Sequence, residues 1–85
     1  MHQTTASTLP PLTEYLERTE VQQLFAAHYP TEQSFSWFIR RNRERLAECG
    51  ALLMIAGRMK LHPALTERVV LEAAHRAALH EGGAA

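Results

Sequence analysis

The stretch TEQSFSWFIRRNRERLAECG, residues 31–50, decides the fold. Within it, six positions recur at the spacing of one helix face: Phe35, Phe38, Ile39, Asn42, Leu46 and Cys49. At about 100° per residue they lie within one stripe, which is the face that a helix buries. Thr31 is a suitable N-cap, and Gly50 is suited to end the helix in the left-handed conformation. The stretch therefore predicts one amphipathic helix over residues 32–48.

The opposite face of this helix carries polar side chains and one tryptophan. Gln33, Arg40 and Arg41 point away from the apolar stripe, and so does Trp37. Polar residues are expected on an exposed face, whereas an indole ring is large and usually mostly buried. Trp37 therefore either packs within the protein or contacts DNA, a partner subunit or the N-terminal arm.

The residues before this stretch predict a shorter helix. Thr19 and Gln22 have the spacing of a capping box, and Glu20 complements the positive end of the helix dipole. Apolar residues then follow at helical spacing, until Pro30 prevents the helix from continuing. We expect a helix from about Thr19 to His28, preceded by a short extended or turn-like segment at Tyr15 and Leu16.

The residues after the stretch predict a β-hairpin and a last helix. Residues 51–55 and 59–62 are two short strand candidates, and Gly57 supplies the positive φ that the tight turn between them needs. Pro63 suits the first turn of a helix from about Ala64 to His80. One apolar seam of that helix faces the core: Leu65, Val69, Ala73 and Ala77, widened by Val70. A second patch is a candidate dimer surface: Leu71, Ala74 and Ala78.

Helix, turn, helix, hairpin, helix is the layout of a winged helix-turn-helix, and three motifs resemble families with this fold. YLERTEVQQLF, residues 15–25, looks like the opening of excisionase and MerR-type DNA-binding domains, although Glu17 stands where a Thr or Ser cap is common. GRMKLHP, residues 57–63, resembles their wing and closing helix. SFSWF, residues 34–38, followed by RERLAECGAL, residues 43–52, resembles a motif of small DNA-binding proteins of plasmids and integrative elements.

This resemblance implies a mainly α fold with a small β-hairpin, in which residues 32–48 are the recognition helix and residues 51–62 the wing. The N-terminal half of a helix in the major groove reaches the base edges. We therefore expect base contacts from Gln33, Ser36, Trp37 and Arg40. Phosphate contacts position a protein on the duplex without reading its base sequence. We expect such contacts from Ser34, Arg41 and Arg43. From the hairpin, Arg58 and Lys60 would reach the flanking backbone or the minor groove.

Charge and composition favour binding over catalysis. Six of the nine Lys and Arg residues lie within residues 40–60, which is typical of a surface that binds phosphates. The chain of 85 residues has no Asp, one cysteine and five histidines without metal-ligand spacing, so we expect no enzyme, no cofactor, no metal and no internal disulfide. No apolar run approaches the ~20 residues of a membrane span, and no signal peptide is visible, so we expect a cytoplasmic protein.

The sequence predicts one domain over residues 12–81, between a flexible arm (1–11) and a disordered tail (82–85). The favoured function is that of a small transcriptional regulator that binds specific double-stranded DNA as a homodimer or a cooperative array. The alternative is an excisionase that bends DNA beside an integrase. A third reading is a protein-interaction module that binds no DNA. Steep salt dependence of duplex binding separates the first two from the third.

Overall fold

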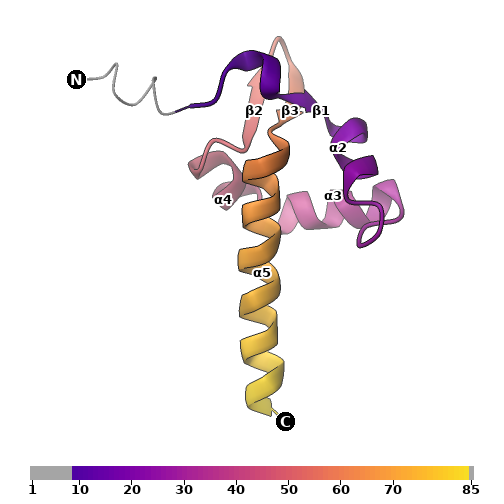
Figure 1. The fold of residues 1–85 in the computed structure, drawn as a ribbon, viewed down its shortest axis with the longest axis vertical. Helices are drawn as coiled ribbons and strands as arrows, with labels where there is room; N and C mark the ends of the chain where they lie inside the picture. Colours follow the sequence, from indigo (N-terminus) through magenta and orange to yellow (C-terminus); the bar gives the residue numbers. More distant parts are fainter. Residues whose placement is uncertain (1–8, 85) are drawn as a thin grey trace, which may run out of the picture.

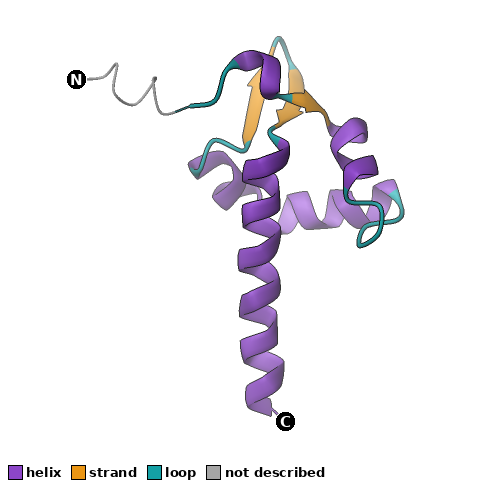
Figure 2. Cartoon of the chain, viewed as in Figure 1, coloured by secondary structure: helices purple, strands orange, loops and turns teal. Residues whose placement is uncertain are grey.

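The computed structural model describes residues 9–84, so most of the predicted N-terminal arm and Ala85 lie outside the described part. The protein is mainly helical and has a small three-stranded antiparallel sheet (Figures 1 and 2). After one 3-10 turn at Leu12–Glu14, the elements follow in this order: β1 (Leu16–Glu17), α2 (Arg18–Leu24), α3 (Glu32–Arg41), α4 (Arg43–Glu48), β2 (Leu52–Ile55), β3 (Arg58–Leu61) and α5 (Pro63–Ala84).

The sheet contains one strand more than the predicted hairpin. Its order is β1-β3-β2, with Leu61 of β3 opposite Leu16 on one side and Leu52 on the other. The extended segment expected at Tyr15 and Leu16 therefore becomes an edge strand over Leu16–Glu17. Next to it, the Tyr15 hydroxyl donates to the carbonyl oxygen of Gly50 at 2.5 Å, which ties β1 to the end of α4.

The hairpin turn consists of two residues with positive φ. Ala56 has φ 52° and Gly57 has φ 78°, the backbone twist of the type I′ turns that suit two-residue hairpins. The prediction for Gly57 is confirmed. Arg58 follows the turn directly as the first residue of β3.

The bounds and the cap predicted for the helix from Thr19 to His28 are wrong. α2 begins at Arg18, with Glu17 as N-cap, and the Glu20 carboxylate accepts from the Glu17 N–H at 3.0 Å. The Thr19–Gln22 capping box does not form, because Gln22 is buried and its amide donates to the Tyr29 carbonyl at 2.6 Å. That bond spans the turn that follows Leu24, where the helix ends, before the predicted His28.

The predicted helix over residues 32–48 is two helices. Thr31 caps α3 as expected, because its hydroxyl accepts from the Ser34 N–H at 3.1 Å. At Asn42 the backbone leaves the helical conformation (φ −117°, ψ 20°), and the side-chain amide donates to the Phe38 carbonyl at 2.9 Å. α4 starts again at Arg43 in another direction (Figure 1). Gly50 ends it with φ 84°, as predicted.

The core lies between α2, α3, α4, the sheet and the first half of α5. Phe35, Leu46, Leu61 and Val21 are fully buried, and Phe38 and Ile39 nearly so. Four aromatic rings pack at centroid separations of 5.3–6.2 Å: Phe25, Tyr29, Phe35 and Phe38. On α5, Val69 is buried, whereas Ala77 of the predicted seam is exposed.

The second half of α5 extends beyond the other elements (Figure 1). The helix continues to Ala84, past the predicted end at His80 and through most of the predicted tail. None of the helices within residues 9–84 combines the length and the apolar character that crossing a bilayer requires.

Candidate nucleic-acid interface

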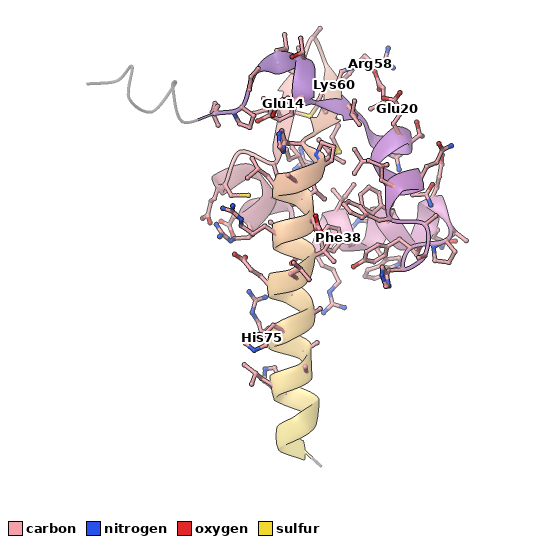
Figure 3. The ribbon with its side chains drawn as sticks, in the orientation of Figure 1. Glu14, Glu20, Phe38, Arg58, Lys60 and His75 are labelled. Atoms are coloured by element: carbon pink, nitrogen blue, oxygen red, sulfur yellow. The ribbon has the colours of Figure 1, made fainter. Side chains whose placement is uncertain are left out.

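The outward face of α3 is held in place by the burial of its inner face. Phe35, Phe38 and Ile39 are buried in the core, and the capping box of Thr31 and Ser34 fixes the N-terminal end. Figure 3 shows Phe38 beside α5, on the inner side of α3. The core packing therefore presents Gln33, Trp37 and Arg40, three of the residues predicted to contact bases, to solvent.

Trp37 lies on this outward face with 55% of its surface exposed. Burial of its ring within the protein, one of the four alternatives, is therefore wrong. The guanidinium carbon of Arg40 lies 5.9 Å from the centroid of the indole ring, a cation–π arrangement. This contact places an aromatic surface and a cation side by side, on neighbouring turns of one helix.

The cations of α3 and α4 differ in their partners. Arg40, Arg41 and Arg43 are exposed, and none of them takes part in an ion pair within residues 9–80. Arg45, by contrast, makes a bidentate pair with Glu72 of α5, with N···O distances of 2.9 and 3.0 Å. The three arginines at the end of α3 and the start of α4 thus keep their donors available.

Two predicted site residues, Ser34 and Ser36, have partners inside the protein. The Ser34 hydroxyl donates to the Thr31 carbonyl at 2.8 Å and belongs to the cap of α3. The Ser36 hydroxyl accepts from Nη1 of Arg18 at 2.9 Å. Ser34 therefore serves the helix end, and Ser36 lies on the flank of α3 that faces α2.

The predicted wing cations share one carboxylate. Glu17 Oε1 lies 3.1 Å from Arg58 Nη2, and Glu17 Oε2 lies 2.5 Å from Lys60 Nζ. The hydrogen bond from Lys60, followed by the charges of Arg58 and Lys60, lowers the pKa of Glu17 below its usual value. Figure 3 shows both cations at the sheet end of the molecule, near Glu20. Glu17 thus neutralises one of the two positive charges that the hairpin would offer to a nucleic acid.

Two hollows lie on either side of α3. The smaller holds about 210 Å³ and is lined by Arg18, Ser36, Ile39, Arg40, Arg43 and Met59. The larger, about 730 Å³, is an open groove between α3 and α5, with Tyr29, Trp37, Phe38, Arg41, Arg76 and His80 among its lining residues. Cations therefore lie on both flanks of the exposed helix face.

Sequence reasoning missed Arg18, Arg76 and Glu17 as parts of this region. Arg18 reaches Ser36 across 18 positions and Glu17 reaches Lys60 across 43, so no local pattern links either pair. Arg76 enters the groove only because α5 passes beside α3. The extended segment predicted at Tyr15 and Leu16 was the one available signal. If it had been extended to Glu17 and paired with the hairpin, it would have placed Glu17 beside β3.

Two side chains with catalytic or metal-binding chemistry, His62 and Cys49, have structural partners. Nδ1 of His62 accepts from the Leu65 N–H at 3.1 Å, and Nε2 lies 2.8 Å from Glu14 Oε1, so this ring caps α5. The Cys49 thiol donates to the Leu46 carbonyl at 3.6 Å. Within residues 9–80, no three His, Cys, Asp or Glu residues come together as a metal site.

Comparison with models of protein families, with curated proteins and with solved structures gave no match to this chain.

Proposed function

We propose that this protein binds double-stranded DNA through α3, as a winged helix-turn-helix with α2 and α3 as the helix pair and the β2–β3 hairpin as the wing. The observation that carries the proposal is the outward face of α3, which presents Trp37 beside Arg40 and leaves Arg40, Arg41 and Arg43 without carboxylate partners among residues 9–80. An exposed helix of this width fits the major groove of B-DNA.

In this proposal each residue has a role set by its position. Gln33 and Arg40 read base edges, because Gln suits adenine and Arg suits guanine in bidentate pairing. Trp37 offers an apolar surface to a thymine methyl group. Arg41 and Arg43 bind phosphates on the two sides of the helix. Arg58 and Lys60 contribute less than the sequence suggests, because Glu17 neutralises part of their charge.

The proposed regulator acts as a homodimer in the cytoplasm. A single module buries about 600–1,000 Å² on DNA, so high specificity usually requires two half-sites. Three exposed residues of α5, Leu71, Ala74 and Ala78, lie on one strip and offer a surface for a second copy. Regulation of transcription is the activity we favour for such a dimer.

The test is duplex binding as a function of salt. Sites are selected from a randomised duplex library, and affinity is then measured by fluorescence anisotropy between 50 and 200 mM salt. We expect log K to fall linearly with log salt, with a slope of about −0.9 for each phosphate neutralised and hence about −3 or steeper. An absence of binding at 50 mM salt would contradict the proposal.

The arrangement of the selected sites separates the two DNA-binding functions. Inverted half-sites fit a dimeric regulator, whereas direct repeats with strong bending fit an excisionase working beside an integrase. Footprinting with hydroxyl radicals reports the spacing, and circular-permutation mobility reports the bend. If the selected sites are direct repeats and the DNA is bent, the proposed function changes from regulator to excisionase.

The groove between α3 and α5 favours a second candidate function, a protein-interaction module. It is open, and its aromatic residues Tyr29, Trp37 and Phe38 lie with Arg41 and Arg76 along it. Aromatic residues and arginines are enriched where proteins bind one another. If duplex binding is absent at every salt concentration, this function takes the place of the first.

A further inference from the structure

Three arginines from three different elements line the smaller hollow beside α3. Arg18 comes from α2, Arg40 from α3 and Arg43 from α4, and no carboxylate is among the lining residues. We infer that this hollow is a binding site for a phosphate group, with Arg18 as the residue that organises it.

Arg18 is held in position by a contact that leaves most of its donors free. Its Nη1 donates to the Ser36 hydroxyl at 2.9 Å, which joins the start of α2 to the outer flank of α3. A guanidinium carries five N–H donors in a planar fork that matches the oxygens of phosphate. The Ser36 hydroxyl accepts this bond and keeps its own proton, so it can donate to the same anion.

The positive charges of the three lining arginines are not balanced by a carboxylate among the described ion pairs. An anion from outside the protein would balance them. Arg45 pairs with Glu72, and Arg58 shares the carboxylate of Glu17 with Lys60. Glu17 precedes Arg18 directly in the chain, but its two oxygens are occupied by Arg58 and Lys60. Like charges close together repel one another, so a bound anion would relieve the repulsion among Arg18, Arg40 and Arg43.

The size and the apolar wall of the hollow suit a phosphate. It holds about 210 Å³, whereas a water molecule occupies about 30 Å³ in the liquid, so four phosphate oxygens and the phosphorus fit. Ile39, which is buried, and Met59, which is half-buried, form its apolar wall. Charge-assisted hydrogen bonds are stronger beside an apolar wall than in open water.

The phosphate can come from two sources that share this chemistry. One is the backbone of a DNA duplex: with α3 in the major groove, one strand runs along the flank that carries Arg18 and Arg43. These two would bind its phosphate, while Arg40 at the margin of the hollow adds its charge and still reaches the base edge. This source rests on the proposed function. The other source is a free phosphate group, which would bind whether or not the protein binds DNA.

The first experiment uses inorganic phosphate and the full chain. Arginine Nε–H resonances are followed by two-dimensional NMR while phosphate replaces chloride at constant ionic strength. We expect the resonances of Arg18, Arg40 and Arg43 to shift with one common dissociation constant, while that of Arg68 stays in place. Arg68 is the control because it is exposed on α5 and makes no ion pair among the described residues. Equal movement of Arg68, or no movement of the three, overturns the site independently of any DNA result.

The second experiment identifies the source with a matched pair of variants, Arg18→Gln and Arg68→Gln. Each removes one positive charge from an exposed or half-exposed helix position, and thermal unfolding checks that both fold. We expect Arg18→Gln to weaken specific and random duplexes alike, by about tenfold, and to reduce the salt slope by about one. Arg68→Gln should change neither quantity.

The outcomes separate this site from the proposed function. If phosphate shifts the three arginines but both variants bind duplex equally well, the ligand is a free phosphate group and the strand takes another path. If the wild-type protein binds no duplex and still shows the phosphate response, the proposed function fails and the site stands. If duplex binds and the NMR response is absent, the site fails and the proposed function stands.

Discussion

Glu17 shows how much one residue determines in a chain of this size. It is the N-cap position of α2, it pairs with Lys60 in the sheet, and its carboxylate contacts both Arg58 and Lys60. The structure supplies a physical reason for the acidic residue, because it holds two cations that the sequence alone would assign to DNA.

The Arg40→Ala variant tests the proposed base contact. We expect a loss of about 1–3 kcal/mol on the selected site and a relaxed preference at one base position. Anisotropy measurements on a set of duplexes, each with one substituted base pair, report both quantities. An equal loss on every duplex would make Arg40 a phosphate contact instead, and Arg68→Ala serves as the control.

The Ala56→Asn variant tests the strain in the hairpin turn. Ala56 has φ 52°, which costs an ordinary L-residue about 1–2 kcal/mol, whereas Asn before Gly is favoured in this turn. We expect the free energy of unfolding to rise by about 0.5–1 kcal/mol, and the melting temperature by several degrees. Calorimetry measures the change. A lower melting temperature would mean that the turn has another conformation.

At the scale of single elements, α3 and α4 show where sequence periodicity fails. The apolar spacing continues without interruption from Phe35 to Cys49, so it predicts one helix. The break lies at Asn42, whose side-chain amide bonds to the Phe38 carbonyl in addition to its own backbone N–H. Asn side chains bond to nearby backbone groups, but only in some helices, so the sequence could not decide the point.

The Phe38→Ala variant tests the burial of the inner face of α3. Phe38 is 6% exposed and packs against Tyr29 and Phe35 at ring separations of 5.3 and 5.9 Å. Its removal should destabilise the protein by about 3–5 kcal/mol, which is a large part of the stability of a small domain. Urea denaturation followed by circular dichroism measures this loss. A change below 1 kcal/mol would contradict the packing described here.

The pair between α4 and α5 gives a pH dependence of stability. The hydrogen bond from Arg45 lowers the pKa of Glu72 below its ordinary value of 4.5; partial burial opposes this effect, and the charge of Arg45 adds to it. A carboxyl group with a lowered folded-state pKa stabilises the protein above its unfolded-state pKa and loses this contribution as the pH falls through the folded-state value. We therefore expect the urea concentration at the unfolding midpoint to decrease as the pH is lowered below about 4.5.

The Glu72→Gln variant should reduce this fall, because it removes one of the titrating groups. Glu67→Gln is the control, since Glu67 is exposed on the same helix and forms none of the described ion pairs. Urea midpoints are compared at pH 7 and pH 3 for the three proteins. If Glu72→Gln depends on pH as the wild type does, the pair is not formed in solution.

At the scale of the whole molecule, the sequence predicted the local order of elements better than their distant contacts. The hairpin, Gly50, the Thr31 cap and the buried phenylalanines follow from patterns within a few residues, and they are confirmed. The third strand, the Arg18–Ser36 bond and the shared Glu17 carboxylate connect segments far apart in the chain. Those contacts depend on how the elements pack, and no spacing rule contains that information.

The length of α5 relative to the rest of the molecule underlies the prediction of a dimer. Leu71 is 61% exposed, and Ala74 and Ala78 are exposed on the same strip. We expect analytical ultracentrifugation to find a dimer, and Leu71→Glu to shift it toward monomer by placing a charge in the interface. Thr13→Glu, a substitution at an exposed position outside α5, is the control. A monomer at the highest concentration reached would contradict the assignment.

The two residues of β1 have a consequence for any shortened form of this chain. They cover one side of β3, whose other side is already paired with β2. A fragment that started at α2 would uncover a row of amide and carbonyl groups on β3, and bare strand margins of this kind recruit other chains into intermolecular sheets. We therefore expect β1 to protect this protein from aggregation, although it contributes only two residues to the sheet.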